Sequence, residues 1–186
     1  MSTDQILSKH KEQCQGAVTS FKRDLSKVRT GRASTGLVDA IQVEYYGSKA
    51  PLKQLAQIST PESRMILIQA YDAGAIPGIE KAIQNSGLGL NPSRDGNLVR
   101  VSIPPLNEQT RKEIVKQLNK IAEEVRVSIR NHRRDANEAL KKLEKDDGLP
   151  KDDGKKAADR IQKQTDSFID EVDKLFKAKE AEVLEV

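Results

Sequence analysis

The chain has 186 residues, of which 36% are hydrophobic, 32% are charged and 3% are aromatic, with no Trp. So few large side chains argue against one thick globular core and favour slender helices that each bury a single apolar stripe. The single Cys excludes an internal disulfide and indicates a reducing compartment. The net charge of +4 permits a nucleic-acid partner without requiring one.

The N-terminal stretch "MSTDQILSKHKEQ" has no apolar run of the kind found in signal peptides, and no segment approaches membrane-spanning length. The apolar residues are nevertheless too regularly spaced for a disordered chain. We therefore expect a folded cytoplasmic protein without a membrane partner.

A helix is predicted over residues 6–28, because its apolar residues recur at steps of three, four and seven and so share one face. These residues are Leu7, Cys14, Val18, Phe21, Leu25 and Val28. Gly31 follows as the expected helix stop. The stretch "RTGRAST" at 29–35 fits either a plain loop after that helix or a joint that also contacts an anion.

Residues 32–104 are typical of a small α+β module. Strands are expected in "DAIQVEYYG", "LKQLAQIS", "RMILIQAY" and "RDGNLVRVSI", with turns at Gly47-Ser48 and Asp95-Gly96. A short helix is expected in "IPGIEKAIQNSGLG". Because adjacent strand residues point to opposite faces, one of Tyr45 and Tyr46 should lie in the core, and the other could stack on a base or a protein partner.

Two long helices are predicted over residues 107–146 and about 154–184, separated by the turn-rich stretch "KDDGLPKDDG". Asn107 is the expected N-cap of the earlier one. Its apolar face comprises Ile114, Leu118, Ile121, Val125, Ile129, His132, Ala136, Leu140 and Leu143. The apolar face of the later one comprises Ala158, Ile161, Thr165, Phe168, Val172 and Leu175, with Lys179 and Glu182 weakening its end. Three such stripes can close on one another, and association with helices of another chain is the alternative.

The sequence therefore predicts an α+β protein in which an elongated three-helix bundle carries a small inserted domain. The bundle would comprise residues 1–30 and 106–186, and the inserted domain residues 31–105. Two connections, at 30–36 and 103–106, would form a hinge, with glycines permitting unusual φ on one side and prolines stiffening the other. We expect a monomer.

Arginines cluster on one flank of the helix predicted over 107–146. Helical spacing places Arg126, Arg130, Arg133 and Arg134 there, with Glu124, Asp135 and Glu138 on the opposite flank. Lys11, Lys22 and Arg29 share one flank of the first helix; if the two basic flanks were adjacent, Arg29 and Arg32 would extend the positive field. Ordinary solvated surface is the alternative. Because Arg suits bidentate phosphate contact, A-form RNA is the natural partner.

Catalytic chemistry is not indicated. Gly87-x-Gly89 lacks the third glycine of a nucleotide loop. Cys14 and His132 lie on apolar faces, where packing is expected, and His10 has no ligand partner at metal-binding spacing. The aspartate pairs at 146–147 and 152–153 could bind a cation, but caps and turns explain them better. We expect no catalytic residues, no metal and no cofactor.

The chain resembles the bacterial and organellar ribosome recycling factor family. The matching stretches, in the expected order over nearly the whole chain, are "RTGRAS", "VEYYG", "PLKQLA", "EKAI" with "LGLNP", "GN" before a strand, "IPPLNEQTRKE", "VRVSIRNHRRDAN" and "KEAE". The resemblance implies a three-helix bundle with a small β/α/β domain inserted through a two-strand hinge, giving an L shape. It also implies a translation factor that binds large-subunit ribosomal RNA in the intersubunit space after termination. Elongation factor G, which binds the GTP, would act with it to separate the subunits.

Residue matching within the resemblance implies two functional sets. The RNA-facing residues would be Arg130 and Arg133, with Arg29, Arg32, Arg126 and Arg134 near them. The hinge residues would be Thr30, Gly31, Arg32, Ala33, Ser34, Pro104 and Pro105. Asn107, Gln109, Thr110 and His132 depart from residues frequent in the family, which affects capping and local packing rather than the arginines. Two other classes stay open: a general helical RNA-binding or scaffold protein, and an enzyme in the α+β module.

Overall fold

The computed structural model describes residues 2–146 and 148–185, which form two compact units. The helical unit comprises Met1–Leu25 and Val115–Ala181. The sheet unit comprises Ser26–Ile114 and Glu182–Val186.

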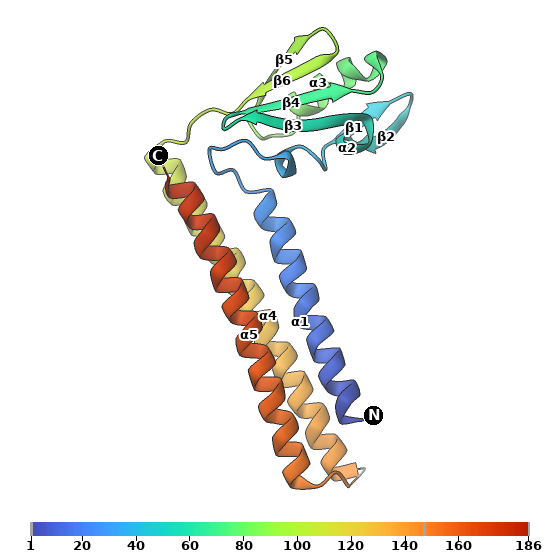
Figure 1. The fold of residues 1–186 in the computed structure, drawn as a ribbon, viewed down its shortest axis with the longest axis vertical. Coiled ribbons are helices and arrows are strands. Elements are labelled where there is room, and N and C mark those ends of the chain that lie inside the picture. Colours follow the sequence, from blue (N-terminus) through green and yellow to red (C-terminus); the bar gives the residue numbers. More distant parts are fainter. Residues whose placement is uncertain (1, 147, 186) are drawn as a thin grey trace. The chain divides into compact units, whose positions relative to one another are not determined.

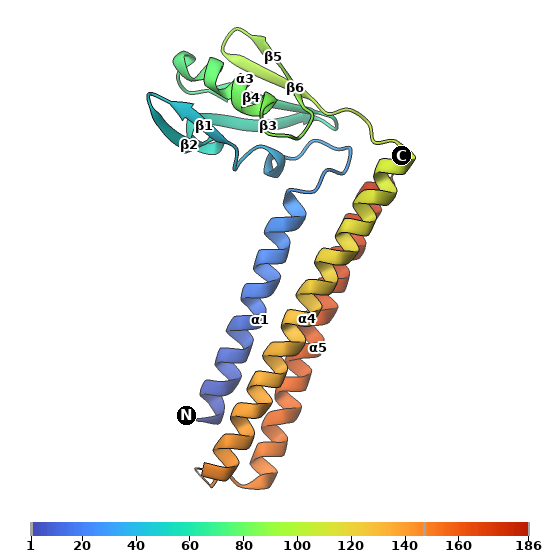
Figure 2. The ribbon, with the colours of Figure 1, turned by 180° about the vertical axis from the view of Figure 1, so that it is seen from behind.

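Three long helices build the helical unit and lie side by side in both ribbon views (Figures 1 and 2). They are α1 (Thr3–Ser26), α4 (Glu108–Asp146) and α5 (Lys151–Leu184). Each buries one stripe at helical spacing, as the sequence predicts. The fully buried members include Phe21 of α1, Leu118 and Ile129 of α4, and Ile161 of α5.

Helix ends differ from the predictions in two places. α1 ends at Ser26, so Val28 lies beyond the helix and Gly31, with φ of +76°, is not its immediate stop. α5 begins at Lys151 rather than near residue 154, because the carbonyl of Pro150 accepts hydrogen bonds from the backbone N–H groups of Asp153 and Gly154, each 3.0 Å long. Asp147, part of the predicted aspartate turn, lies outside the described residues.

The seam between α1 and α5 contains a polar cluster that the sequence reading missed. His10 is 1% exposed, and its two ring nitrogens lie 2.9 Å from Gln164 Oε1 and 3.2 Å from Thr165 Oγ1. Cys14 Sγ lies 3.5 Å from the second nitrogen. His10 fills the seven-residue gap that the predicted apolar stripe left between Leu7 and Cys14, so it belongs to the core rather than to a metal site.

The sheet unit contains a hairpin and a four-stranded antiparallel sheet. β1 (Gln42–Tyr45) pairs with β2 (Ser48–Pro51), and the sheet has the strand order β3-β4-β6-β5. The four strands of the sheet are β3 (Ala56–Glu62), β4 (Met65–Ala70), β5 (Asn91–Asp95) and β6 (Leu98–Ser102). The short helices are η1 (Thr35–Leu37), α2 (Leu52–Leu55), η2 (Ala73–Ala75) and α3 (Ile76–Gln84).

Alternating residues of β4 and β6 form an aliphatic core with α3. Ile66 and Ile68 of β4 are fully buried together with Ile79 and Ile83 of α3. At Gly78 the helix packs directly on β1, because an added Cβ would lie 2.6 Å from the Glu44 carbonyl oxygen. This close approach fixes the hairpin against α3.

Two local predictions for the sheet unit are wrong. Leu52–Leu55, expected to begin a strand, forms the single helical turn α2 before β3. The hairpin turn lies at Tyr46–Gly47 rather than at Gly47-Ser48, because Tyr45 pairs directly with Ser48. The α+β fold class itself, three long helices with a small sheet domain inserted between the first two, is confirmed. The domain boundaries and the monomeric state stay predictions.

Candidate nucleic-acid interface

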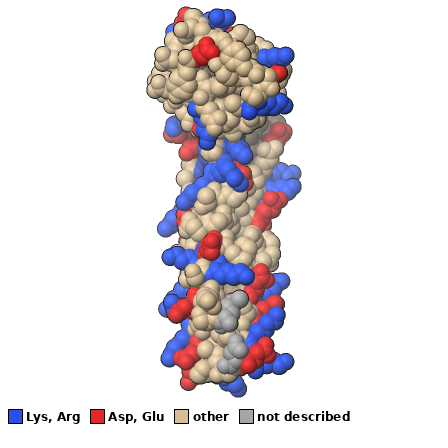
Figure 3. All heavy atoms as spheres, turned by 90° about the vertical axis from the view of Figure 1, so that its right-hand side faces the viewer, with Lys and Arg blue, Asp and Glu red and all other residues tan. Residues whose placement is uncertain are grey.

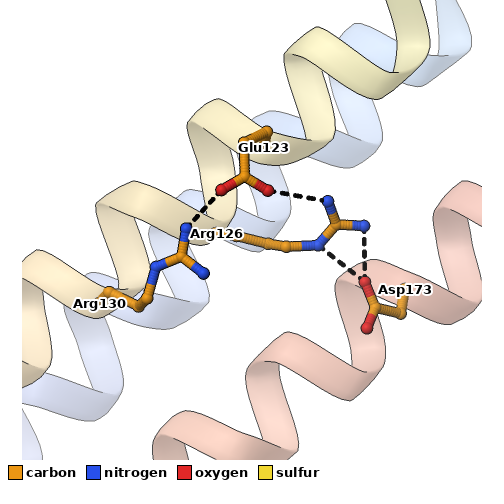
Figure 4. A network of polar contacts seen from close by, with 4 residues as sticks. All are labelled: Glu123, Arg126, Arg130 and Asp173. Carbon is orange, nitrogen blue, oxygen red and sulfur yellow. Dashed lines mark hydrogen bonds and ion pairs between the residues drawn. The ribbon is translucent and has the colours of Figure 1, made fainter.

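Arg126 joins α4 to α5. Its Nε and Nη2 both donate to Asp173 Oδ1, at 2.8 and 2.7 Å, and its Nη1 donates to Glu123 Oε2 at 3.2 Å (Figure 4). The guanidinium carbon also lies 5.9 Å from the centre of the Phe176 ring. Burial alone would lower the pKa of Arg126, but the bonds to Asp173 and Glu123 outweigh it and raise that pKa. Arg126 is therefore bound within the helical unit and is the least available of the four arginines on this flank of α4.

Arg130 shares the carboxylate of Glu123 with Arg126, since it forms an ion pair with the other oxygen (Figure 4). Hydrogen bonds from Arg130 and then Arg126 hold the pKa of Glu123 below its ordinary value, so the carboxylate is charged at neutral pH. The Arg130 side chain is 44% exposed, against 20% for Arg126. Arg130 is thus held in place by a partner that an incoming phosphate could replace.

Arg133 and Arg134 are more loosely engaged. Arg133 Nη1 donates to Gln162 Oε1 of α5 at 2.9 Å, and Gln162 in turn donates to Asp166 at 2.7 Å. Arg134 is exposed and makes no hydrogen bond or ion pair with the described residues. Arg130, Arg133 and Arg134 therefore form an open basic strip on α4 beside α5, and we call these three residues the α4 strip.

The basic flanks of α1 and α4 border α5 from its two sides instead of meeting each other. Lys22 of α1 pairs with Glu171 of α5 at 2.7 Å, whereas Arg126 of α4 pairs with Asp173 of α5. The α1–α4 groove is lined instead by residues that include Lys9, Gln13 and Asp135. The two basic flanks are therefore not adjacent, which was the condition for a merged positive field. Over one face, both signs of charge alternate along the helices (Figure 3).

The other two predicted RNA-facing arginines belong to the sheet unit. Arg32 pairs with Glu185 at 2.6 Å, and both side chains are more than half exposed. Arg29 is partly buried, and its Nε has no hydrogen-bond partner among the described residues. An added Cβ on Gly89 would lie 3.8 Å from Arg29 Nη1, so the guanidinium passes close to this loop backbone. Arg29 thus carries a buried donor that a ligand oxygen could satisfy.

The two predicted hinge segments are both attached to the β3–β4 turn. The backbone N–H of Ala33 donates to the Ser63 carbonyl at 2.7 Å, and that of Ile103 donates to the Arg64 carbonyl at 2.8 Å. Among the hinge residues, Thr30 is buried, Ser34 is half-buried and Gly31 has a left-handed backbone, whereas Pro104 and Pro105 are exposed. Ala33 and Ile103 are therefore both bonded to the same turn of the sheet unit, and the hinge role of these segments stays a prediction.

Comparison with known proteins assigns the family. The sequence model described as Ribosome recycling factor matches residues 21–184. The ribosome-recycling factor of Desulfosudis oleivorans is 54% identical over 166 residues, which cover 89% of this chain and 90% of the relative. The chain belongs to the ribosome recycling factor family.

Solved structures of ribosome recycling factors share the fold. A solution structure of the ribosome recycling factor matches with a TM-score of 0.82 and 47% identity, over 100% of this chain and 99% of that chain. A second match, with a TM-score of 0.72 and 42% identity, covers 99% of this chain and 100% of that chain. It is the T. thermophilus ribosome recycling factor, described with the E. coli elongation factor G bound to the E. coli post-termination complex.

Three of the residues that the resemblance led us to expect as departures from the family make capping or local bonds. Asn107 Oδ1 accepts a hydrogen bond from the Thr110 backbone at 2.7 Å, so the predicted N-cap is present. Gln109 donates to Glu113 at 3.1 Å. His132 is partly buried, with Nε2 3.3 Å from Ser128 Oγ. These contacts lie within or just before α4 and leave the α4 strip unchanged.

The sequence reading missed the residues that hold the arginines. Glu123 could have been found, since it precedes Arg126 by three positions on the same helix. The sequence does not reveal the other three partners, which are Asp173, Gln162 and Glu185. Their positions depend on the rotation of α5 about its axis and on the course of the last residues. Among the described residues, no group of three metal-ligating side chains comes together, and no helix has both the length and the apolar character to cross a membrane.

Proposed function

We propose that this chain recycles ribosomes after termination. It binds the large subunit in the intersubunit space, mainly through ribosomal RNA, and splits the post-termination complex together with elongation factor G and GTP. The observation that carries the proposal is family membership, joined to a related factor described with elongation factor G on the post-termination complex. The chain acts in the cytoplasm as a monomer and not as an enzyme. It needs no cofactor of its own, since elongation factor G binds the GTP.

The α4 strip is proposed as the main RNA anchor. Arg134 is exposed to an incoming phosphate. Arg133 exchanges its hydrogen bond to the neutral Gln162 amide for a phosphate, and Arg130 exchanges its ion pair with Glu123. Bonds between a guanidinium and a phosphate are charge-assisted, so the exchange at Arg133 is favourable. Arg126 supports the strip by fixing Glu123, and Arg29 and Arg32 are proposed as further RNA contacts of the sheet unit.

Residues 30–36 and 103–106 are proposed as a hinge that lets elongation factor G move the small inserted domain while the α4 strip stays on RNA. The tethers at Ala33 and Ile103 support this role, because they leave only a few residues on each connection to absorb a change in φ and ψ. Two connections resist twisting better than one, which suits a lever.

The proposal is tested by subunit splitting, followed by light scattering with purified post-termination complexes. The wild-type chain should split them only when elongation factor G and GTP are both present. Failure to split in the complete mixture would overturn the proposal. A matched binding assay with an unrelated structured RNA at equal salt gives the control, since equal affinity for that RNA would indicate a general RNA-binding protein.

The hinge is tested by replacing Pro104 and Pro105 with Gly. These prolines are exposed and their nitrogens carry no hydrogen, so the change loosens the connection without removing a donor. Large-subunit binding should be retained and splitting should slow. Equal losses of binding and splitting would argue against a separate hinge.

A further inference from the structure

Tyr46 has a backbone conformation that its side chain disfavours. It is the one non-glycine residue with positive φ in the described part of the chain, at +47°, and it precedes Gly47 at +79° in the two-residue hairpin turn. Such turns prefer Asn-Gly, and a bulky residue there is strained. A strained residue at a turn is a candidate for function.

The Tyr46 ring is also the most exposed large hydrophobic side chain among the described residues, at 84%. It is nevertheless held in place. The Tyr45 ring contacts it at a centroid distance of 4.5 Å with the planes 73° apart, and an added Cβ on Gly74 would lie 3.4 Å from its hydroxyl. The ring therefore contacts the sheet unit along one edge and leaves most of its surface free.

A carboxylate stands beside this ring. Asp72 Oδ2 accepts a hydrogen bond from the Tyr45 hydroxyl at 2.5 Å, and Oδ1 accepts one from the Gly74 backbone at 3.0 Å. These bonds, first that of Tyr45 and then that of Gly74, hold the pKa of Asp72 below its ordinary value, so it is charged at neutral pH. Glu44, two positions before Tyr46, is also exposed, and Lys49 lies opposite it in the hairpin register.

An exposed aromatic ring beside a carboxylate suits a cation. Guanidinium and ammonium groups bind the faces of aromatic rings, and carboxylates strengthen the attraction. RNA phosphates would instead be repelled by Asp72. Tyr and Arg are enriched at the centres of protein interfaces, which makes a basic protein segment the occupant that this surface fits.

We propose that Tyr46 and Asp72 form a docking site for an arginine or lysine side chain of a protein in the complex on which this factor acts. The inference rests on the proposed function, because that function supplies the complex. It assigns a protein contact to the sheet unit, distinct from the RNA contact of the α4 strip.

Three variants separate a docking role from a folding role. Tyr46→Asn should melt at the wild-type temperature or higher, because Asn favours the turn, and should split complexes about tenfold more slowly through loss of one cation–aromatic contact. Tyr46→Phe should keep the wild-type rate, since the ring remains. Tyr71→Asn is the matched control, because Tyr71 is a 71% exposed tyrosine of the same unit and should tolerate the change. A lower melting temperature for Tyr46→Asn, or a wild-type splitting rate, would overturn the inference.

The occupant is identified by placing the photoreactive residue p-benzoylphenylalanine at position 46 or 71. The probe is used in complexes assembled from purified ribosomes, elongation factor G and a non-hydrolysable GTP analogue. We expect a cross-link from position 46 to a protein segment containing Arg or Lys, and none to that segment from position 71. A cross-link from position 46 to RNA, or none at all, overturns the inference while wild-type splitting in the same preparation keeps the proposed function intact. A wild-type chain that splits nothing overturns both.

Discussion

The helical unit and the sheet unit use polar side chains differently. In the helical unit, ion pairs link α5 to each neighbouring helix, and His10 and Thr165 meet inside the seam. In the sheet unit the main core cluster is aliphatic and carries no such pair among its described members. Charged pairs there stay at the surface, as between Arg100 and Asp95.

The difference follows from how each architecture fixes its register. Strands are aligned by a ladder of backbone hydrogen bonds, so side chains need only fill the core. Smooth apolar helix faces can slide along one another, and a buried or half-buried polar contact selects one alignment. We therefore expect the helical unit to depend on particular polar side chains and the sheet unit to depend mainly on volume.

The largest effects are expected from cavities in either core. Ile129→Ala in α4 and Ile68→Ala in β4 each remove most of a fully buried side chain and should lower the free energy of unfolding by about 2–5 kcal/mol. Hydrogen exchange should show increased opening mainly in the unit that carries the change. Equal loss of protection in both units would mean that they do not unfold separately.

Substitutions in the two units should differ clearly in their effect on ribosome binding. Arg133→Ala should weaken large-subunit binding by about 1–3 kcal/mol, because a charge-assisted phosphate contact is lost. Arg94→Ala is the matched control in the sheet unit, where the Arg94 side chain donates to the Gly96 carbonyl at the β5–β6 turn. Affinities measured by filter binding at two salt concentrations give the test. Equal losses for the two variants would contradict an anchor on α4.

The sequence was sufficient to locate the three helices, because their apolar stripes persist over many turns. It was also sufficient to place an α+β insert between the first two. Short segments were harder to predict. The apolar residues of Leu52–Leu55 suit a strand and a helical turn equally well. Only the structure shows that the segment is one helical turn between the extended residues Pro51 and Ala56. Gly47 signalled the hairpin turn without deciding whether its partner was Tyr46 or Ser48.

The arginine flank was also predictable, since helical spacing alone places four arginines on one side of α4. Their availability was not. Arg126 and Arg130 are close in sequence, yet one is bound to Asp173 and the other reaches solvent, because α5 covers only the nearer side of the flank. The rotation of a helix about its own axis depends on all three seams, and no single stripe reveals it.

Removing Asp173 should test the polar alignment of the helical unit. Asp173→Ala leaves the partly buried Arg126 without its two-bond partner and should cost about 1–2 kcal/mol. Asp95→Ala, which breaks the exposed pair with Arg100 in the sheet unit, should cost about 0.5 kcal/mol or less. Chemical denaturation of both variants measures the difference. A larger cost at Asp95 would reverse the comparison between the units.

A smaller effect is expected at the start of α4. Asn107→Ala removes the cap on the Thr110 N–H and should destabilise the fold by about 1 kcal/mol. Gln109→Ala, two positions along the same segment, loses only an exposed side-chain contact with Glu113 and should be nearly neutral. Thermal unfolding of the two variants side by side shows whether the cap matters. Identical midpoints would exclude a capping contribution.

The smallest effects concern pH, and the two units should differ in their response to alkali. The folded-state pKa of Glu123 lies below its ordinary value of 4.5, because Arg130 and then Arg126 donate to the carboxylate. Its contribution to stability is therefore complete above about pH 4.5 and is lost as the pH falls through the folded pKa. Glu123→Gln should melt below wild type at pH 7, and the gap should close in acid.

The Tyr45–Asp72 pair of the sheet unit should respond at both ends of the pH scale. The pKa of Asp72 is lowered, so its contribution is lost in acid like that of Glu123. The hydrogen bond to Asp72 raises the pKa of Tyr45 from 10.0 to about 12. The contribution that depends on the protonated Tyr45 hydroxyl is therefore complete below pH 10 and is lost as the pH rises through 12. Tyr45→Phe should therefore narrow its gap from wild type in alkali, whereas Glu123→Gln should keep its gap there, because the guanidinium partners of Glu123 do not titrate in that range. Parallel alkaline profiles for the two variants would contradict the assignment of the Tyr45 hydroxyl as the donor to Asp72.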